Sequence, residues 1–197
     1  MDFERFQKQL AFIEEMDRVK LVLRNTILLD ASRRENDAEH TWHMAVCAML
    51  FTEYSNEKNL DMLKVLKMIM VHDIVEIDAG DTFVYDDKGN LDKKERETKA
   101  AERIFGLLPE DQGEEFIALW QEFEEYETPE SKYAHLADTF MPIYHNYRTK
   151  GLQWQRMNVT SDKVLNRNNH IKKGSGEIWS YVESMVSDAV EKGYLEP

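Results

Sequence analysis

The sequence is poor in the residues that cross-link, bend or interrupt a chain. It contains one cysteine (Cys47), four prolines and eight glycines among 197 residues. A single cysteine excludes an internal disulfide bond, which fits a reducing compartment. The few glycines and prolines leave long uninterrupted segments in which helices can form.

Basic residues and long apolar runs are also scarce. The chain has 25 Lys and Arg against 38 Asp and Glu, a net charge of −13. Because affinity for nucleic acid depends on basic side chains that neutralise phosphates, we expect no nucleic-acid partner and no binding to an acidic membrane surface. No apolar run approaches the ~20 residues needed to span a bilayer. The first ten residues, MDFERFQKQL, lack the apolar core of a signal peptide, so we expect a cytoplasmic protein.

Apolar residues recur at helical spacing along most of the chain, which predicts an all-α fold. Asn36 with Glu39 resembles a capping box, Thr128-Pro129 is typical of a helix start, and Gly80 is typical of a helix end. Residues 81–90 (DTFVYDDKGN) are expected to form a loop or a short hairpin. The length suits one domain. The expected helices cover 2–23, 37–57, 60–78, 91–107, 109–126, 129–149, 161–171 and 175–192.

The most apolar segment, KMIMVHDIVEI (67–77), carries His72, Asp73 and Glu76. Burying an unpaired charge is costly, so such groups are normally paired or bound to a metal. On a helix, His72 and Glu76 are one turn apart and Asp73 lies on a neighbouring face, so all three can face one cavity. Taken alone, a His–Glu pair with an exposed Asp73 explains the segment equally well.

Two distant segments contain further metal-ligand types. Glu39-His40 opens a helix that then becomes apolar, and Asp138 lies in an apolar-leaning run before Pro142. With the His72-Asp73 pair, His40 and Asp138 make a set of two imidazoles and two carboxylates. This mixture suits Mn, Fe, Co, Ni or Zn, with coordination positions left open for water.

The pattern H…HD…D in an all-α chain resembles the HD-domain metal-dependent phosphohydrolases, and among them the 5′-deoxynucleotidases. The resemblance rests on Arg24, on SRRENDAEHTWHMAV (32–46), on HDIVEIDAGD (72–81) and on Asp138. It covers about residues 10–170. It implies a single HD domain over residues 1–197, a bundle of about seven to eight helices on which the helix 175–192 packs.

The same resemblance implies that one divalent ion is bound by His40, His72, Asp73 and Asp138. His43, one turn after His40, remains an alternative first ligand. His135 and His145 are interpreted as packing or surface residues. A single ion is expected because dinuclear HD phosphodiesterases have additional histidines between the His-Asp pair and the last aspartate, where this chain has only His135.

The segment 17–34 is locally basic, with five Lys or Arg against two Asp, and this favours the binding of a small anion. The resemblance implies that Arg24 binds the substrate phosphate. In the bacterial deoxynucleotidases an aromatic residue near the sugar follows this arginine. Here Asn25 stands in its place, so the preference for deoxyribose over ribose stays open.

Two acidic residues are candidates for proton transfer. Glu76 could accept a proton from the attacking water and return one to the leaving oxygen. The alternative role for Glu76 is support of His72. Asp81 could orient the water or contact the sugar, and the alternative is that it caps a turn.

The expected reaction is metal-dependent hydrolysis of a (deoxy)nucleoside 5′-monophosphate to a nucleoside and phosphate. Two other functions stay open, namely a catalytically silent HD-type regulator that binds a nucleotide or metal, and a hydrolase of another phosphorylated nucleotide. We also expect a homodimer, because the C-terminal third is rich in large apolar side chains such as Trp154 and Trp179. Intrachain packing of these residues is the alternative.

Overall fold

The computed structural model describes residues 1–82, 85, 89 and 91–197, and over these residues the fold is helical, as expected. The loop or hairpin expected at 81–90 lies mostly outside the described residues. The helices are α1 (Phe3–Met16), α2 (Asp37–Phe51), α3 (Met62–Val71), α4 (Glu76–Ala79), α5 (Lys93–Phe105), α6 (Glu110–Glu125), α7 (Pro129–Arg148), α8 (Leu152–Arg156), α9 (Ser161–Asn168), α10 (Ile171–Gly174) and α11 (Gly176–Glu191).

The local signals for helix boundaries are confirmed. Asn36 and Glu39 form a capping box at the start of α2, because each side chain bonds the backbone N–H of the other. Thr128 caps α7 with Pro129 at its first position. Gly80 ends α4 with a φ of 74°, a left-handed conformation that favours glycine.

One expected helix, 2–23, is shorter than predicted because the chain turns into a small sheet. After α1 comes a 3-10 helix, η1 (Asp17–Leu21), and then strand β1 (Leu23–Ile27), which pairs antiparallel with β2 (Arg34–Asn36). The exposed Arg34 side chain donates to the carbonyl oxygen of Leu23 at 2.7 Å and holds the pair together. The two-stranded sheet was not expected, and it carries Arg24 on β1 and Glu35 on β2.

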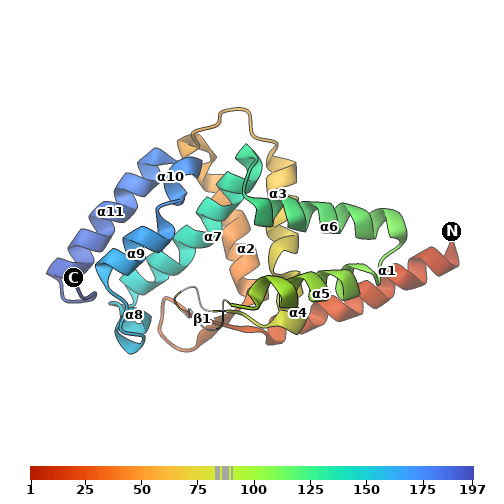
Figure 1. Ribbon diagram of the computed structural model, residues 1–197, viewed down its shortest axis with the longest axis horizontal. Helices are drawn as coiled ribbons and strands as arrows, with labels where there is room; N and C mark the ends of the chain where they lie inside the picture. The colour runs from red at the N-terminus through yellow and green to blue at the C-terminus, as the bar shows by residue number, and fades with distance from the viewer. Residues whose placement is uncertain (83–84, 86–88, 90) are drawn as a thin grey trace.

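Helix α7 forms the centre of the fold, and α2, α3, α6, α10 and α11 all pack against it (Figure 1). The contact with α2 includes a buried hydrogen bond from the Tyr133 hydroxyl to the carbonyl oxygen of Ala48, 2.6 Å long. On one side, α8 to α11 close over the apolar face of α7, and the buried residues of α11 join that same core.

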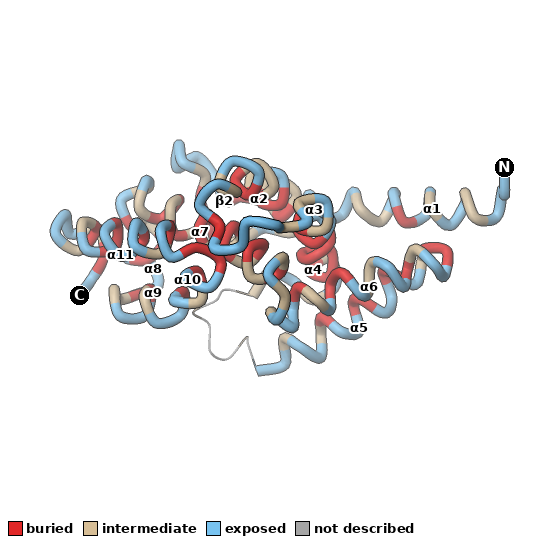
Figure 2. Tube along the Cα trace, turned by 90° about the horizontal axis from the view of Figure 1, so that it is seen from above, coloured by how far each residue is buried: buried red, intermediate tan, exposed pale blue. Residues whose placement is uncertain are grey.

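A second apolar cluster lies on the other side of the fold, where α1, α5 and α6 meet the residues that follow α3. Most of α1 is exposed and projects from the body of the molecule, and Phe12 is its one buried residue (Figure 2). Ile74 and Val75 belong to this second cluster, whereas the buried apolar residues of α2 and α7 belong to the first. Side chains from both clusters therefore meet at the boundary between them.

No helix in the described part of the chain is long and apolar enough to cross a membrane.

Candidate metal centre

The segment that carries His72, Asp73 and Glu76 is not one helix, contrary to our expectation. Helix α3 ends at Val71, residues His72–Val75 form a 3-10 helix, η3, and α4 begins at Glu76. Val71 has a φ of −107°, which is wider than the α-helical value, and the tighter turn follows it. The change in winding alters the faces on which the three side chains lie. All three nevertheless line one cavity of about 280 Å³.

His40, His72 and Asp73 form a buried group in which one ligand atom from each lies within 4.8 Å of the others. They come from α2 and η3, which are about thirty residues apart in sequence. Asp73 Oδ2 is the common point, 3.1 Å from Nε2 of His72 and 4.0 Å from Nε2 of His40. Asp138 of α7 joins them, with its Oδ1 at 3.0 Å from His40 Nε2. We call these four residues the His72 cluster.

The imidazole of His72 is held in the orientation of a ligand. Its Nδ1 donates to the carbonyl oxygen of Ile69 at 2.7 Å, which leaves Nε2 with a free lone pair in the neutral ring. Nε2 is buried and makes no hydrogen bond with any described residue. Nε2 thus faces Asp73 Oδ2 at 3.1 Å without a hydrogen bond, an arrangement in which one metal ion can be bound by both groups.

His40 is fully buried between carboxylates on both sides. Its Nε2 faces Asp138, and its Nδ1 lies 3.6 Å from Oε2 of Glu35. Burial and the charge of Arg24 lower the pKa of His40, but the two carboxylates outweigh them and raise it to about 9. Burial alone would raise the pKa of Asp138, yet His40 holds that pKa below its usual range. Without a metal, His40 therefore carries a proton at neutral pH.

Arg24 lies at the same cavity and neutralises its carboxylates. Its Nη1 donates to Asp73 Oδ2 at 2.6 Å and to Asp37 Oδ1 at 3.1 Å. The guanidinium is also 4.0 Å from Asp81 and 3.9 Å from Asp138. Burial disfavours the charge of Arg24, but these carboxylates raise its pKa well above the ordinary value. The arginine that sequence analysis selected is thus a buried cation beside the His72 cluster.

Glu76 and Asp81 both reach this cavity, and both have raised pKa values. Burial raises the pKa of Glu76 well above its usual range, and the negative charge of Asp73 adds to this. Burial likewise raises the pKa of Asp81. By contrast, His72 and Arg24 outweigh burial and lower the pKa of Asp73. Neighbouring carboxylates with separated pKa values are typical of sites that move protons.

Asp37 is a further acid at the site that sequence analysis missed. It lies at the start of α2, fully buried, and its carboxylate belongs to a group with those of Asp73 and Glu76. Burial and the charge of Asp73 raise its pKa to about 7. Its position three residues before His40 was the available signal, because that spacing places both on one helix face.

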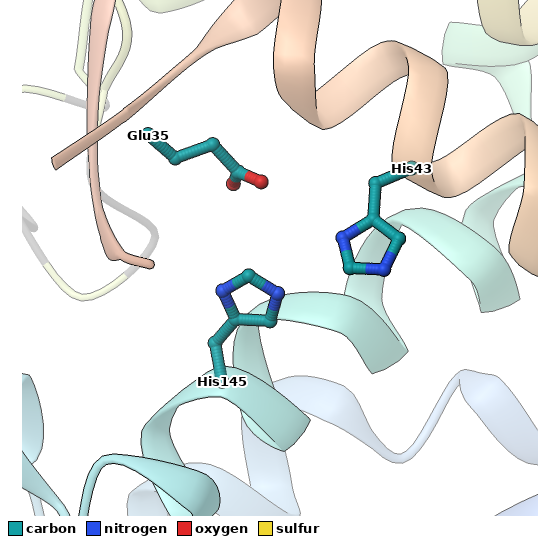
Figure 3. A group of neighbouring side chains, drawn as sticks. All are labelled: Glu35, His43 and His145. Atoms are coloured by element: carbon teal, nitrogen blue, oxygen red, sulfur yellow. The ribbon is translucent and has the colours of Figure 1, made fainter. Parts of the chain in front are cut away.

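His43, the alternative first ligand, points elsewhere. It lies with Glu35 and His145 in a separate group of side chains (Figure 3). His40 is the histidine of α2 that lies with His72 and Asp73. The 280 Å³ cavity is also lined by residues that sequence analysis did not assign to the site. They include Lys93, Glu97, Phe123, Glu124, Gln153, Trp154 and Asn168.

The donor set fits a divalent cation. Asp37, Asp73 and Glu76 bring three carboxylates within 4.8 Å of one another, and the single guanidinium of Arg24 pairs with two of them. Such a buried excess of acid is costly unless it is protonated or bound by a metal. The unpartnered Nε2 of His72 and Oε2 of Glu76 add one nitrogen and one oxygen ligand atom. Mixed nitrogen and oxygen ligands suit the Mn-to-Zn series.

Comparison with known proteins identifies the family of the chain. The family model described as HD domain matches residues 16–179. A solved structure described as a "Predicted metal-dependent phosphohydrolase" from Magnetospirillum magnetotacticum MS-1 is 47% identical, with a TM-score of 0.93, and the match covers 98% of this chain and 96% of that one. A protein of Pyrococcus horikoshii OT3, 20% identical with a TM-score of 0.62, shares the fold.

Two similar curated proteins are named 5′-deoxynucleotidase HDDC2. The Homo sapiens protein is 30% identical over 130 residues, which is 66% of this chain and 62% of that protein. The Mus musculus protein is 29% identical over 134 residues, 68% of this chain and 63% of that protein. The chain thus spans less than two thirds of the length of these relatives.

Proposed function

The chain belongs to the HD domain family, and from this we propose that it is a metal-dependent phosphohydrolase that converts (deoxy)nucleoside 5′-monophosphates to nucleosides and phosphate. One observation carries the proposal. The largely buried Arg24 lines one cavity with His72, Asp73 and Asp138, and the fully buried His40 lies directly behind them, with its Nε2 3.0 Å from Asp138 Oδ1. Hydrolysis of a phosphate ester needs both a metal site and a separate cation for the remaining phosphoryl oxygens.

The metal would be held by His40, His72, Asp73 and Asp138. A divalent ion bound there supplies Lewis acidity, since it withdraws charge from a phosphoryl oxygen and makes a water molecule more acidic. Nδ1 of His72 stays bonded to Ile69, so its ring is oriented before any ion arrives. His40 must give up its proton to serve as a ligand.

Arg24 is proposed to bind the phosphate of the substrate. Its guanidinium has five N–H donors, and the contacts to Asp37 and Asp73 use Nη1. Nε is buried and makes no hydrogen bond with the described residues. Arg24 therefore keeps donors for an anion while Asp37 and Asp73 fix its position.

Glu76 is proposed to handle the proton. Its pKa is raised without a metal, and Oε2 is buried without a hydrogen bond in the described part of the chain. A positive ion nearby would favour the ionised form, which can take a proton from the attacking water and give it to the leaving oxygen. Asp81, which lines the same cavity, is proposed to orient the water or contact the sugar.

The size and lining of the cavity favour a small-molecule substrate. A volume near 280 Å³ lies close to the lower limit of ligand pockets, which is about 300 Å³. Trp154, Tyr85 and Phe123 give the cavity an aromatic lining, in which the ring of Phe123 is stacked on His135, and an aromatic lining suits a nucleoside. Asn25 also lines the cavity, in keeping with its expected place near the sugar. The names of the curated relatives support the deoxynucleotide class.

The proposal is tested by a phosphate-release screen of the purified protein against nucleoside 5′-monophosphates, ribo and deoxy, with Mn²⁺, Co²⁺, Fe²⁺, Ni²⁺ and Zn²⁺ in turn. We expect release with at least one ion and none with chelator. Asp73→Asn should abolish it. The matched control is Asp78→Asn, which changes an acid on α4 that pairs with Arg103 at the surface. No release with any metal and nucleotide would overturn the proposal.

A further inference from the structure

A second group of potential metal ligands lies outside the His72 cluster. Glu35 of β2, His43 of α2 and His145 of α7 each offer one ligand atom, and these atoms all lie within 4.8 Å of one another. Figure 3 shows the carboxylate of Glu35 and the two rings turned toward a common point. The two ring centroids are 5.4 Å apart. We call these three residues the Glu35 cluster.

His145 is oriented as His72 is. Its Nδ1 donates to the carbonyl oxygen of Ile27 at 3.0 Å, so the neutral ring presents the lone pair of Nε2 to the cluster. The side chain is 3% exposed, and Nε2 makes no hydrogen bond with any described residue. Metal-binding histidines typically donate the other ring N–H to a backbone carbonyl or a carboxylate. His72 and His145 both show this arrangement.

Glu35 is a buried carboxylate whose neighbouring positive charge comes from His40, a proposed ligand of the first site. It is 3% exposed, and among the described residues its partner at ion-pair distance is His40, with 3.6 Å between Oε2 and Nδ1. A buried carboxylate is costly unless it is paired or binds a metal. A cation between Glu35 and the two histidines would meet this need directly.

His43 completes the group and connects it to the surface. It is half-buried, and it lines the edge of an apolar hollow between α2, α7 and α11 that includes Leu50, Tyr144 and Tyr181. Burial and the proximity of His145 lower the pKa of His43, so its ring is neutral at pH 7 and free to bind a metal. An ion can therefore reach the group from the side of His43.

We propose that Glu35, His43 and His145 bind a second divalent transition-metal ion. Two imidazoles and one carboxylate are a ligand set typical of Zn²⁺ with a fourth position left to water. From the sequence we expected a single ion, with His43 as an alternative ligand of the first site and His145 as a packing or surface residue. A second ion at the Glu35 cluster goes beyond that expectation. Glu35 lies between the two sites, since it also approaches His40.

The test is a count of bound ions. Metal-free protein is titrated with Zn²⁺ by calorimetry, and after desalting the zinc per chain is measured by elemental analysis. We expect two ions for the unmodified protein and one for His145→Gln. Glutamine can still donate to the Ile27 carbonyl, so the backbone contact is kept. His43→Gln, at a half-buried position, provides the same test if His145→Gln does not fold.

The matched control is His170→Gln, which should keep two ions. Both ring nitrogens of His170 already have partners, Nε2 with the Thr139 hydroxyl at 2.9 Å and Nδ1 with the Arg167 carbonyl at 3.1 Å. In a second readout, Zn²⁺ should raise the melting temperature of Asp73→Asn through the remaining site, and this rise should vanish when His43→Gln is added.

Three results would overturn the proposal. The first is one zinc ion per unmodified chain at saturation. The second is two ions that persist in both His145→Gln and His43→Gln, which would mean that the Glu35 cluster is a hydrogen-bonded network around water. The third is loss of the second ion in Glu76→Gln with retention in His145→Gln, which would assign that ion to the carboxylates of the first cavity.

Discussion

The His72 cluster and the Glu35 cluster hold a histidine in the same way but differ in their surroundings. His72 and His145 each face a backbone carbonyl with Nδ1 and leave Nε2 buried without a hydrogen bond. Beside the His72 cluster lie a buried guanidinium and acids with raised pKa values, in a cavity open to a small molecule. Among the described residues, Glu35 has only His40 at ion-pair distance.

This difference shows which features are needed to bind a metal ion and which are needed in addition for catalysis. Holding an ion requires ligand atoms and oriented rings, and both clusters provide them. Hydrolysis of a phosphate ester also requires a cation for the phosphoryl oxygens and a group that moves protons. Only the His72 cluster has these within the described part of the chain, so we assign the reaction to it.

Asp73→Ala should have the largest effect. It removes the carboxylate oxygen to which His72, His40 and Arg24 all point. We expect loss of the ion from the His72 cluster and phosphate release at background level. Breaking a buried ion pair should also cost about 3–5 kcal/mol of stability. Metal content, melting temperature and phosphate release are measured together. An Asp73→Ala protein that keeps its ion and its melting temperature would contradict the assignment of Asp73 as a ligand.

Glu76→Gln should separate proton transfer from metal binding. The change keeps the shape of the side chain but removes its ability to take up a proton. We expect the ion to stay and kcat to fall by about 10²–10⁴-fold, the usual contribution of general acid–base catalysis. Steady-state kinetics with metal content measured on the same sample checks this. Near-normal kcat with the ion bound would assign Glu76 to the support of His72.

Arg24→Lys should have a smaller effect on catalysis. Lysine keeps the charge but lacks the planar fork that spans Asp37, Asp73 and an anion. We expect kcat/KM to fall by about 10–10³-fold, a loss of about 1.4–4 kcal/mol of transition-state binding. Arg33→Lys is the control, because Arg33 is exposed and pairs with Glu39. An equal fall in both variants would show that Arg24 does not bind the phosphate.

The substitution of His135 should have the smallest effect, a change in how stability depends on pH. This histidine lies outside both clusters, so it extends the comparison. Its Nε2 donates to the carbonyl oxygen of Phe123 at 2.8 Å, and burial lowers the pKa of its ring to about 4. The unfolded chain takes up a proton below pH ~6.5, but the folded protein does so only near pH 4. The contribution of the His135 ring to the free energy of unfolding is therefore fully present above pH ~6.5 and is lost as the pH falls toward 4.

His135→Gln removes this titration, so the stability of the variant should fall less steeply than that of the wild-type protein as the pH is lowered from 6.5 to 4. We expect the wild-type protein to lose about 1–3 kcal/mol more between pH 6.5 and 4 than the variant does. Urea unfolding at several pH values measures the difference. Parallel curves for the two proteins would mean that the ring is protonated in the folded state as readily as in the unfolded chain.

The sequence was sufficient to predict the fold class, and the resemblance identified four side chains that lie together at the first site. Helical periodicity and the capping signals at Asn36 and Thr128 are local properties, so they could be read directly. Placing His40 beside His72 rested on a resemblance, because no periodicity relates α2 to η3. The winding change at Val71 could not be foreseen, since tertiary packing overrides the helical pattern of KMIMVHDIVEI.

The residues that were missed are those whose role depends on distant contacts. Glu35 and His145 are 110 positions apart and meet because β2 and α7 both border α2. The strands are short, and among the described residues they pair only with each other, which gives a weak sequence pattern. In the sequence, Asp37 resembles any acidic residue in the first turn of a helix. Its role becomes evident from its hydrogen bond with Arg24 in the folded protein.

The central claim, that an ion in the His72 cluster drives phosphate release, is tested most directly by measuring both quantities on one sample. Metal-free protein is loaded with increasing Mn²⁺ or Co²⁺, and phosphate release from a nucleoside 5′-monophosphate is recorded at each bound fraction. We predict that activity rises in proportion to the occupancy of the site that Asp73→Ala removes. Full occupancy of that site without release of phosphate from any nucleoside 5′-monophosphate would contradict the account.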